Sequence, residues 1–220
     1  MLNKNIRKII SSGLIITSIL ATTILNGCDT KKVSNKNNNV SSEQAKDNGD
    51  IISSSSGFEL KSYSEQPPNT KEEVVERVVD GDTIVVKGGE KGKKIRFLLV
   101  DTPETKKPKT PVQPFGKKAC DFTKNALKKG DKIYVQYGKS KSDKYGRYLG
   151  YIYYKKDGNW IMLNEELVSE GLARVGYVYE DKDHLEELNK AQEYAQDNQL
   201  NIWSKPGYVT NKGYNPDVFK

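Results

Sequence analysis

Short apolar runs separated by glycine-containing turns dominate the middle of the chain. Asp80-Gly81 lies between the first two runs and Gly88-Gly89 between the second and third, and both pairs are hairpin signals. The sequence therefore predicts three antiparallel strands that follow one another as a meander, the last ending near Asp101.

Two further strands and three helices are predicted after the meander. Apolar residues alternate with polar ones at 133–137, and a second strand pattern covers 148–154. Helical spacing of apolar residues predicts helices over about 116–129, over 164–171 with Asn164 as a cap, and from Asp181 or Asp183 onward. Five short strands with a helix between the third and fourth indicate an α+β fold, a five-stranded Greek-key β-barrel of the OB type with three helices.

The N-terminal segment has the pattern of an export signal. Three basic residues precede an uncharged run over 9–25, which ends in Leu25-Asn26-Gly27-Cys28. Leucine three positions before a cysteine, with glycine directly before it, resembles a bacterial lipobox. We interpret residues 1–28 as a lipoprotein-type signal peptide with Cys28 as the lipidated first mature residue. Ordinary signal cleavage and an uncleaved anchor are the alternatives.

Composition sets the remaining boundaries. Residues 29–69 are rich in Ser, Asn, Lys and Gln and lack the apolar surface that offsets ordering entropy, so they are expected to be a flexible tether. The folded domain is assigned to residues 70–204. The glycine- and proline-containing residues 205–220 are expected to form a loose tail.

Charge and rare residues exclude several kinds of chemistry. The formal net charge is +7, and the three basic residues before the N-terminal apolar run contribute to it, so charge alone permits a polyanionic partner without requiring one. The chain has one histidine, His184, and two cysteines, one of them in the predicted signal. A zinc site and paired-histidine phosphodiester chemistry are therefore excluded. Any hydrolytic site must use carboxylates, arginines and a metal.

Acidic residues meet at one edge of the predicted meander. Asp82 opens its second strand and Asp101 closes its third, and these two ends lie at the same edge. Glu104 follows three residues later, and Arg96 lies in the third strand. Three converging oxygen donors beside an arginine suit a divalent cation and a phosphate.

The alternative for these residues is ordinary turn chemistry, because Asp-Gly and Asp-Thr-Pro are common in loops. Strict strand alternation would also place Arg96 and Asp101, five residues apart, on opposite faces. A bulge or a loss of strand geometry near Asp101 would reconcile the two. On the residues alone, an arginine such as Arg96 in a strand is more often a solvated residue of the exposed face.

These motifs together resemble the staphylococcal nuclease (thermonuclease) family over roughly residues 70–204. The resemblance rests on five stretches in order: Asp80-Gly81-Asp82-Thr83, the run from Arg96 to Thr105, Asp143-Lys144-Tyr145-Gly146-Arg147, Gly171-Leu172-Ala173-Arg174-Val175 with Tyr177-Val178-Tyr179, and Leu200-Asn201-Ile202-Trp203. It implies the same OB-type fold.

The resemblance also implies roles for individual residues. Asp82, Asp101 and the backbone carbonyl of Thr102 resemble calcium ligands. Glu104 resembles the residue that holds the attacking water as general base, and Arg96 and Arg147 resemble the pair that grips the scissile phosphate. Contacts to bound nucleotide are implied for Lys144, Tyr145, Tyr177 and Tyr179. Without the resemblance, Arg147 would be a plain turn residue and Tyr179 could pack in the barrel.

The sequence thus predicts a calcium-dependent, sugar-nonspecific endonuclease that hydrolyses DNA and RNA and leaves 3′-phosphate ends. We expect a monomer, held by an N-terminal lipid on the extracellular face of the cell membrane or else secreted. The contrasting hypothesis is a non-catalytic OB-fold module that binds single-stranded nucleic acid. Such a module needs a basic, aromatic groove but no acidic cluster.

Overall fold

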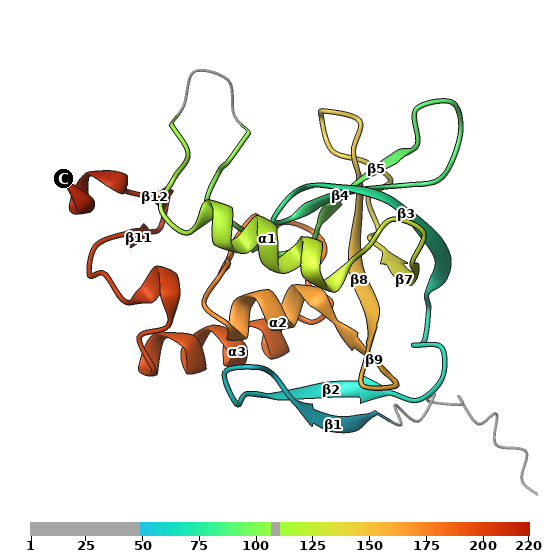
Figure 1. The fold of residues 1–220 in the computed structure, drawn as a ribbon, viewed down its shortest axis with the longest axis horizontal. Helices are drawn as coiled ribbons and strands as arrows, with labels where there is room; N and C mark the ends of the chain where they lie inside the picture. Colours follow the sequence, from blue (N-terminus) through green and yellow to red (C-terminus); the bar gives the residue numbers. More distant parts are fainter. Residues whose placement is uncertain (1–48, 107–110) are drawn as a thin grey trace, which may run out of the picture. The chain divides into compact units, whose positions relative to one another are not determined.

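The computed structural model describes residues 49–106 and 111–220. The predicted signal peptide, with Cys28, and residues 29–48 of the predicted tether lie outside these residues. Figure 1 shows the described elements in chain order. They are β1 (Asp50–Ser53), β2 (Glu59–Tyr63), β3 (Lys71–Asp80), β4 (Thr83–Val86), β5 (Lys93–Phe97), β6 (Val100–Asp101), α1 (Gly116–Ala126), β7 (Lys132–Tyr137), β8 (Tyr148–Lys156), β9 (Asn159–Met162), α2 (Leu163–Ser169), β10 (Arg174–Val175), α3 (Leu185–Asp197), η1 (Asn201–Trp203), β11 (Val209–Thr210), β12 (Gly213–Tyr214) and η2 (Pro216–Phe219).

Five strands close into a barrel in the order β7-β3-β4-β5-β8, and β8 pairs back with β7. The β3–β4 and β4–β5 pairs are the two predicted hairpins, whereas β5 and β8 run parallel. Together with α1, α2 and α3 (Figure 1), the barrel confirms the predicted α+β, OB-type architecture.

The core fills the barrel and continues beneath the helices. Ile84, Ile95 and Ile152 are fully buried on barrel strands, and Leu167 and Leu188 are fully buried on α2 and α3. Burial of side chains of this size contributes roughly 1.5–3 kcal/mol each. The barrel and the helices therefore share one hydrophobic core, which fixes the strand ends that carry the site.

The prediction of a tether up to residue 69 is wrong for its last part. Strands β1 and β2 form a hairpin, and β2 pairs with β9 through Ser62 and Tyr63. Leu60 is fully buried. The free edge of β9 supplies hydrogen-bond partners, and the few apolar residues of β2 supply enough buried surface to order it despite the polar composition around them.

The C-terminal segment also differs from the prediction of a loose tail. Residues 205–220 contain the β11–β12 hairpin and η2, and Tyr208 is fully buried. Aromatic residues supply its apolar surface. In the part of the chain that the structure describes, no helix is both long and apolar enough to span a bilayer.

Candidate active site

The third meander strand breaks before it reaches Asp101. Strand β5 ends at Phe97, Leu99 adopts a left-handed backbone conformation with φ of 60°, and the chain then forms β6, which pairs with β10. Asn164 does not cap α2 as predicted. Its buried side chain instead donates to the Leu98 carbonyl (2.9 Å) and accepts from the amide of Ile152 (3.0 Å), which satisfies the backbone at the break. This loss of strand geometry removes the alternation conflict between Arg96 and Asp101.

Arg96 is the centre of the site and is only 8% exposed. Its Nη1 donates to the carbonyls of Phe97 (2.8 Å) and Val100 (2.7 Å), the two sides of the strand break. Its Nη2 lies 3.0 Å from Oδ2 of Asp82 and 3.7 Å from Oδ1 of Asp101. One buried guanidinium thus brings the two predicted metal ligands together.

Both aspartates are fixed by further donors. Oδ2 of Asp82 accepts from the amide (3.1 Å) and the hydroxyl (3.0 Å) of Thr102. Oδ2 of Asp101 accepts from Nε of Arg174 (3.0 Å) and lies 2.9 Å from Nη2 of the same guanidinium in an ion pair. Burial raises the pKa of Asp101, with the nearby Asp82 adding to the shift and Arg174 and Arg96 opposing it. The two buried carboxylates are therefore held in place, and two arginines neutralise their negative charge.

Glu104 does not converge with these two carboxylates. Its amide donates to Oε1 of Gln113 (2.8 Å), and its carboxylate accepts from the amide of Lys106 (2.7 Å). It lies next to Asp80, which braces the same loop by accepting from the hydroxyl of Thr105 (2.7 Å). Within residues 49–106 and 111–220, no three Asp, Glu, His or Cys side chains gather closely enough to hold a metal. The three carboxylates therefore do not form one metal-holding group in these residues, and Glu104 lies on the loop after Pro103 that its contact with Gln113 anchors.

Arg147 occupies a tight turn of its own. Oδ1 of Asp143 accepts from the amides of Tyr145 (2.9 Å) and Arg147 (3.0 Å), and Oδ2 accepts from Nε of Arg147 (2.7 Å). Gly146 completes the turn with φ of 72°. Among the described ion pairs, Arg147 pairs with Asp143, whereas Arg96 pairs with Asp82 and Asp101, so the two arginines share no ion-pair partner there.

Exposed tyrosines adjoin both arginines. The Tyr177 ring lies 5.4 Å from the Arg96 guanidinium carbon, and the Tyr145 ring lies 5.4 Å from that of Arg147 and 5.2 Å from Nζ of Lys144. Tyr179 is 74% exposed, so it does not pack in the barrel. These rings present faces on which bases could stack without selecting among them.

Sequence reasoning assigned no role to several residues that hold the site. Arg174 orients Asp101. Asp80 orients Thr105. Gln113 orients Glu104. Arg174 lies opposite Asp101 in the β6–β10 register. That pairing depends on the strand break at Leu99, which no local sequence pattern predicts.

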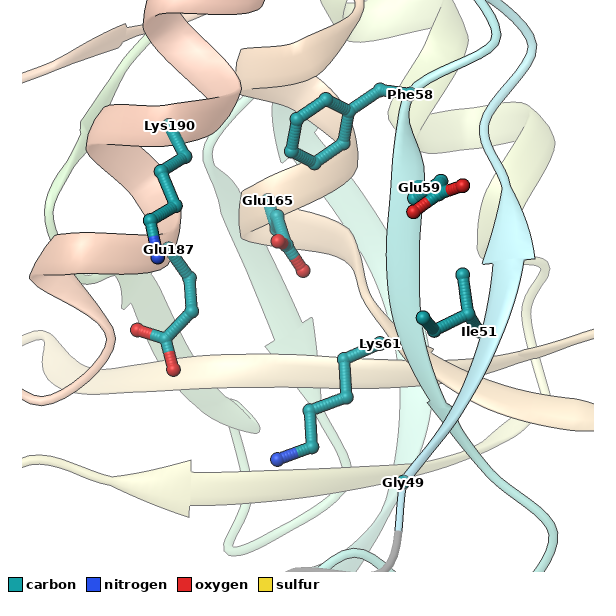
Figure 2. Close-up of a pocket in the computed structure, with 8 residues that line it drawn as sticks. All are labelled: Gly49, Ile51, Phe58, Glu59, Lys61, Glu165, Glu187 and Lys190. Carbon is teal, nitrogen blue, oxygen red and sulfur yellow. The ribbon is translucent and has the colours of Figure 1, made fainter.

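One hollow in the described surface is lined by none of these residues. It has a volume of about 340 Å³ and is lined by β1, β2, α2 and α3. Figure 2 shows Glu165 of α2, Lys61 of β2 and Glu187 of α3 around this hollow. Burial, followed by the charge of Glu187, raises the pKa of Glu165 from its ordinary 4.5 to about 7, against the opposing charge of Lys61.

Replacement of Glu165 with glutamine is expected to stabilise the protein above neutral pH. A carboxyl whose pKa is raised on folding stabilises the folded state fully below its unfolded pKa, and that stability is lost as pH rises through the folded value. Glu165→Gln should therefore raise the free energy of unfolding by about 2 kcal/mol at pH 8 and by about zero at pH 4.5. Urea denaturation at both pH values measures this difference. An equal change at the two pH values would contradict it.

A closed five-stranded barrel with a buried arginine–aspartate cluster at one rim, beside exposed tyrosines, defines an OB-fold protein suited to a polyanion. The family model described as staphylococcal nuclease homologue matches residues 94–205. The chain belongs to this family.

Named relatives agree with the family. The chain is 45% identical over 143 residues to endonuclease YncB of Bacillus subtilis (strain 168), covering 64% of this chain and 65% of that protein. It is 44% identical to the SPbeta prophage-derived endonuclease YokF of the same organism, covering 64% of this chain and 47% of YokF. It is 46% identical over 128 residues to a thermonuclease of Staphylococcus hyicus, covering 58% of this chain and 73% of that protein. The match therefore covers less than two thirds of YncB and of YokF.

Proposed function

We propose that this protein is a calcium-dependent, sugar-nonspecific endonuclease that hydrolyses DNA and RNA and leaves 3′-phosphate ends. The observation that carries the proposal is the buried Arg96, which holds Asp82 and Asp101 together beneath the exposed Tyr177 ring. A module that only binds nucleic acid gains nothing from two desolvated carboxylates, because they repel phosphate and cost free energy to bury.

The donor set of this cluster fits calcium. Asp82, Asp101 and the carbonyl of Thr102 are all hard oxygen donors, and calcium tolerates a mixture of carboxylate, carbonyl and water ligands in flexible geometry. Both carboxylates already contact the same guanidinium nitrogen, so they lie close enough to share one cation. A calcium ion held there would neutralise part of the negative charge on the phosphate that is attacked.

The remaining residues bind and orient the substrate. The contacts of Arg96 with the described residues use Nη1 and Nη2. Its Nε is therefore the donor that would bind a phosphate oxygen. Arg147 is held by Asp143 with its side chain 28% exposed, and it would bind a second oxygen of a bound strand. Such charge neutralisation and positioning dominate phosphoryl-type transfer. Glu104 would hold the water and accept its proton, and the hydrogen bond from its amide to Gln113 would keep the loop that carries it in place.

Calcium dependence and sugar tolerance can be tested together. Purified protein should degrade plasmid DNA and a structured RNA in calcium, and both activities should stop in excess chelator. Magnesium alone should support little turnover, because it demands a tight octahedron and dehydrates reluctantly. Full activity in excess chelator would rule out the metal assignment. Binding of single strands without hydrolysis would favour the non-catalytic module.

We also propose that the protein acts as a monomer outside the cell, anchored by a lipid on Cys28 or else secreted. The order of features in residues 1–28 supports this location: basic residues come first, an apolar run follows, and Leu25-Asn26-Gly27-Cys28 ends the segment. Two acyl chains on one cysteine suffice for stable anchoring. The same nuclease assay on cell fractions should find activity with the membrane, and Cys28→Ala should move it to the medium.

A further inference from the structure

The C-terminal strap, defined as residues 205–220, is built around aromatic rings that pack in tilted and edge-to-face pairs. Tyr208 is fully buried, and its ring centroid lies 5.2 Å from that of Tyr214 and 5.0 Å from that of Phe219. Phe115, directly before α1, packs against Tyr208 at 5.9 Å. The strap is therefore a fixed part of the domain, and its polar groups have defined directions.

Two tyrosine hydroxyls of the strap donate to backbone carbonyls of other segments. The hydroxyl of Tyr214 donates to the carbonyl of Asp101, and that of Tyr208 donates to the carbonyl of Pro114. Burial raises the pKa of Tyr214 well above its ordinary value, and the charge of Asp101 adds to the shift, so the hydroxyl remains a donor.

The carbonyl that Tyr214 contacts belongs to the peptide group between Asp101 and Thr102. The N–H of that same peptide group donates to Oδ2 of Asp82 at 3.1 Å. Because a peptide group is planar, two hydrogen bonds on its opposite sides fix how it is rotated. Tyr214 of the strap thus holds the carbonyl side of this peptide group, and Asp82, a predicted metal ligand, holds its N–H side.

We propose that Tyr214 is a positioning residue of the nuclease site, which orients the Asp101–Thr102 peptide and through it the aspartate pair. This inference rests on the proposed function. Tyr214 touches neither substrate nor metal in this account. The peptide group joins the Cα atoms of Asp101 and Thr102. Its orientation therefore sets the directions of the Asp101 side chain and of the Thr102 backbone.

Tyr214→Phe tests the proposal because it removes one hydroxyl and keeps the ring. The calcium concentration for half-maximal activity is expected to rise about fivefold to tenfold, as loss of one buried hydrogen bond predicts. Direct calcium affinity, measured by titration calorimetry on the substrate-free protein, should fall by the same factor. The KM for DNA should change less than the calcium requirement, because Tyr145 and Tyr177 are untouched.

Tyr208→Phe is the matched control, since it removes the strap's other hydroxyl bond, at Pro114. Tyr208→Phe should lower the melting temperature about as much as Tyr214→Phe does, but it should leave calcium affinity unchanged. Equal losses of calcium affinity in the two variants, or loss of the native circular dichroism of Tyr214→Phe, would show a purely structural strap and overturn the inference. Unchanged calcium affinity in Tyr214→Phe with an active wild type would overturn this inference alone. An inactive wild type would overturn the proposed function and this inference with it.

Discussion

Replacement of Arg96 with lysine is expected to lower kcat/KM by about 10³-fold or more, although the charge is kept. The guanidinium makes planar contacts that an ammonium cannot reproduce. Nη1 joins the carbonyls of Phe97 and Val100, and Nη2 holds Asp82 at 3.0 Å. Lysine would leave at least one of these partners unpaired, and Asp101 would then depend on Arg174 alone.

The same variant should also lose stability, by about 2–4 kcal/mol, because unpaired buried charges and carbonyls are costly. Initial rates on DNA and urea denaturation of the same sample measure both effects. Arg77→Lys, at an exposed position on β3, is the matched control and should change neither. If Arg96→Lys retains activity near the wild-type value, Arg96 is only a structural charge.

Glu104→Gln is expected to reduce kcat by about 10²- to 10⁴-fold, the contribution typical of a general base, with nucleotide affinity nearly intact. The structure retains two of the loop's hydrogen bonds in this variant, while the contact of the side chain with Asp80 changes. The backbone of Glu104 is held by Gln113, and an amide oxygen in place of the carboxylate can still accept from the amide of Lys106. The loop should therefore keep its conformation while the proton acceptor is lost.

Glu104→Asp should be impaired as well, because a displacement of about 1 Å can cost on the order of 10²-fold. Glu90→Gln, at an exposed position between β4 and β5, is the control for loss of one negative charge. Measurement of kcat, nucleotide affinity and melting temperature on each variant separates catalysis from loop structure. A glutamine variant within tenfold of the wild-type kcat would make Glu104 a structural loop residue.

The barrel was predictable because its signals are local. Asp80-Gly81 and Gly88-Gly89 mark the two hairpins, and the helices follow from apolar spacing. The β1–β2 hairpin was not predictable in the same way, since the polar composition around Leu60 outweighs its short apolar face. The strap was missed because β11 and β12 have two residues each and are ordered by aromatic packing at a distance.

At the site, sequence patterns placed Asp82 and Asp101 at one edge but not the groups that hold them. Arg174 reaches Asp101 through a pairing that exists only because β5 breaks at Leu99. Glu104 was expected beside the aspartates because it is three residues from Asp101. The hydrogen bonds to Gln113 instead fix it on a separate loop. Both differences come from long-range contacts, which a linear motif does not encode.

The most direct test of the central claim is product analysis on a single oligonucleotide. The protein is incubated in calcium with an excess of a DNA strand of defined mass, and the fragments are weighed by mass spectrometry, with Glu104→Gln as the parallel sample. We predict wild-type fragments that carry a 3′-phosphate on one side of each cut and a 5′-hydroxyl on the other, with the mass of one water gained per cut. Intact oligonucleotide, recovered in complex with wild-type protein in the presence of calcium, would contradict the account.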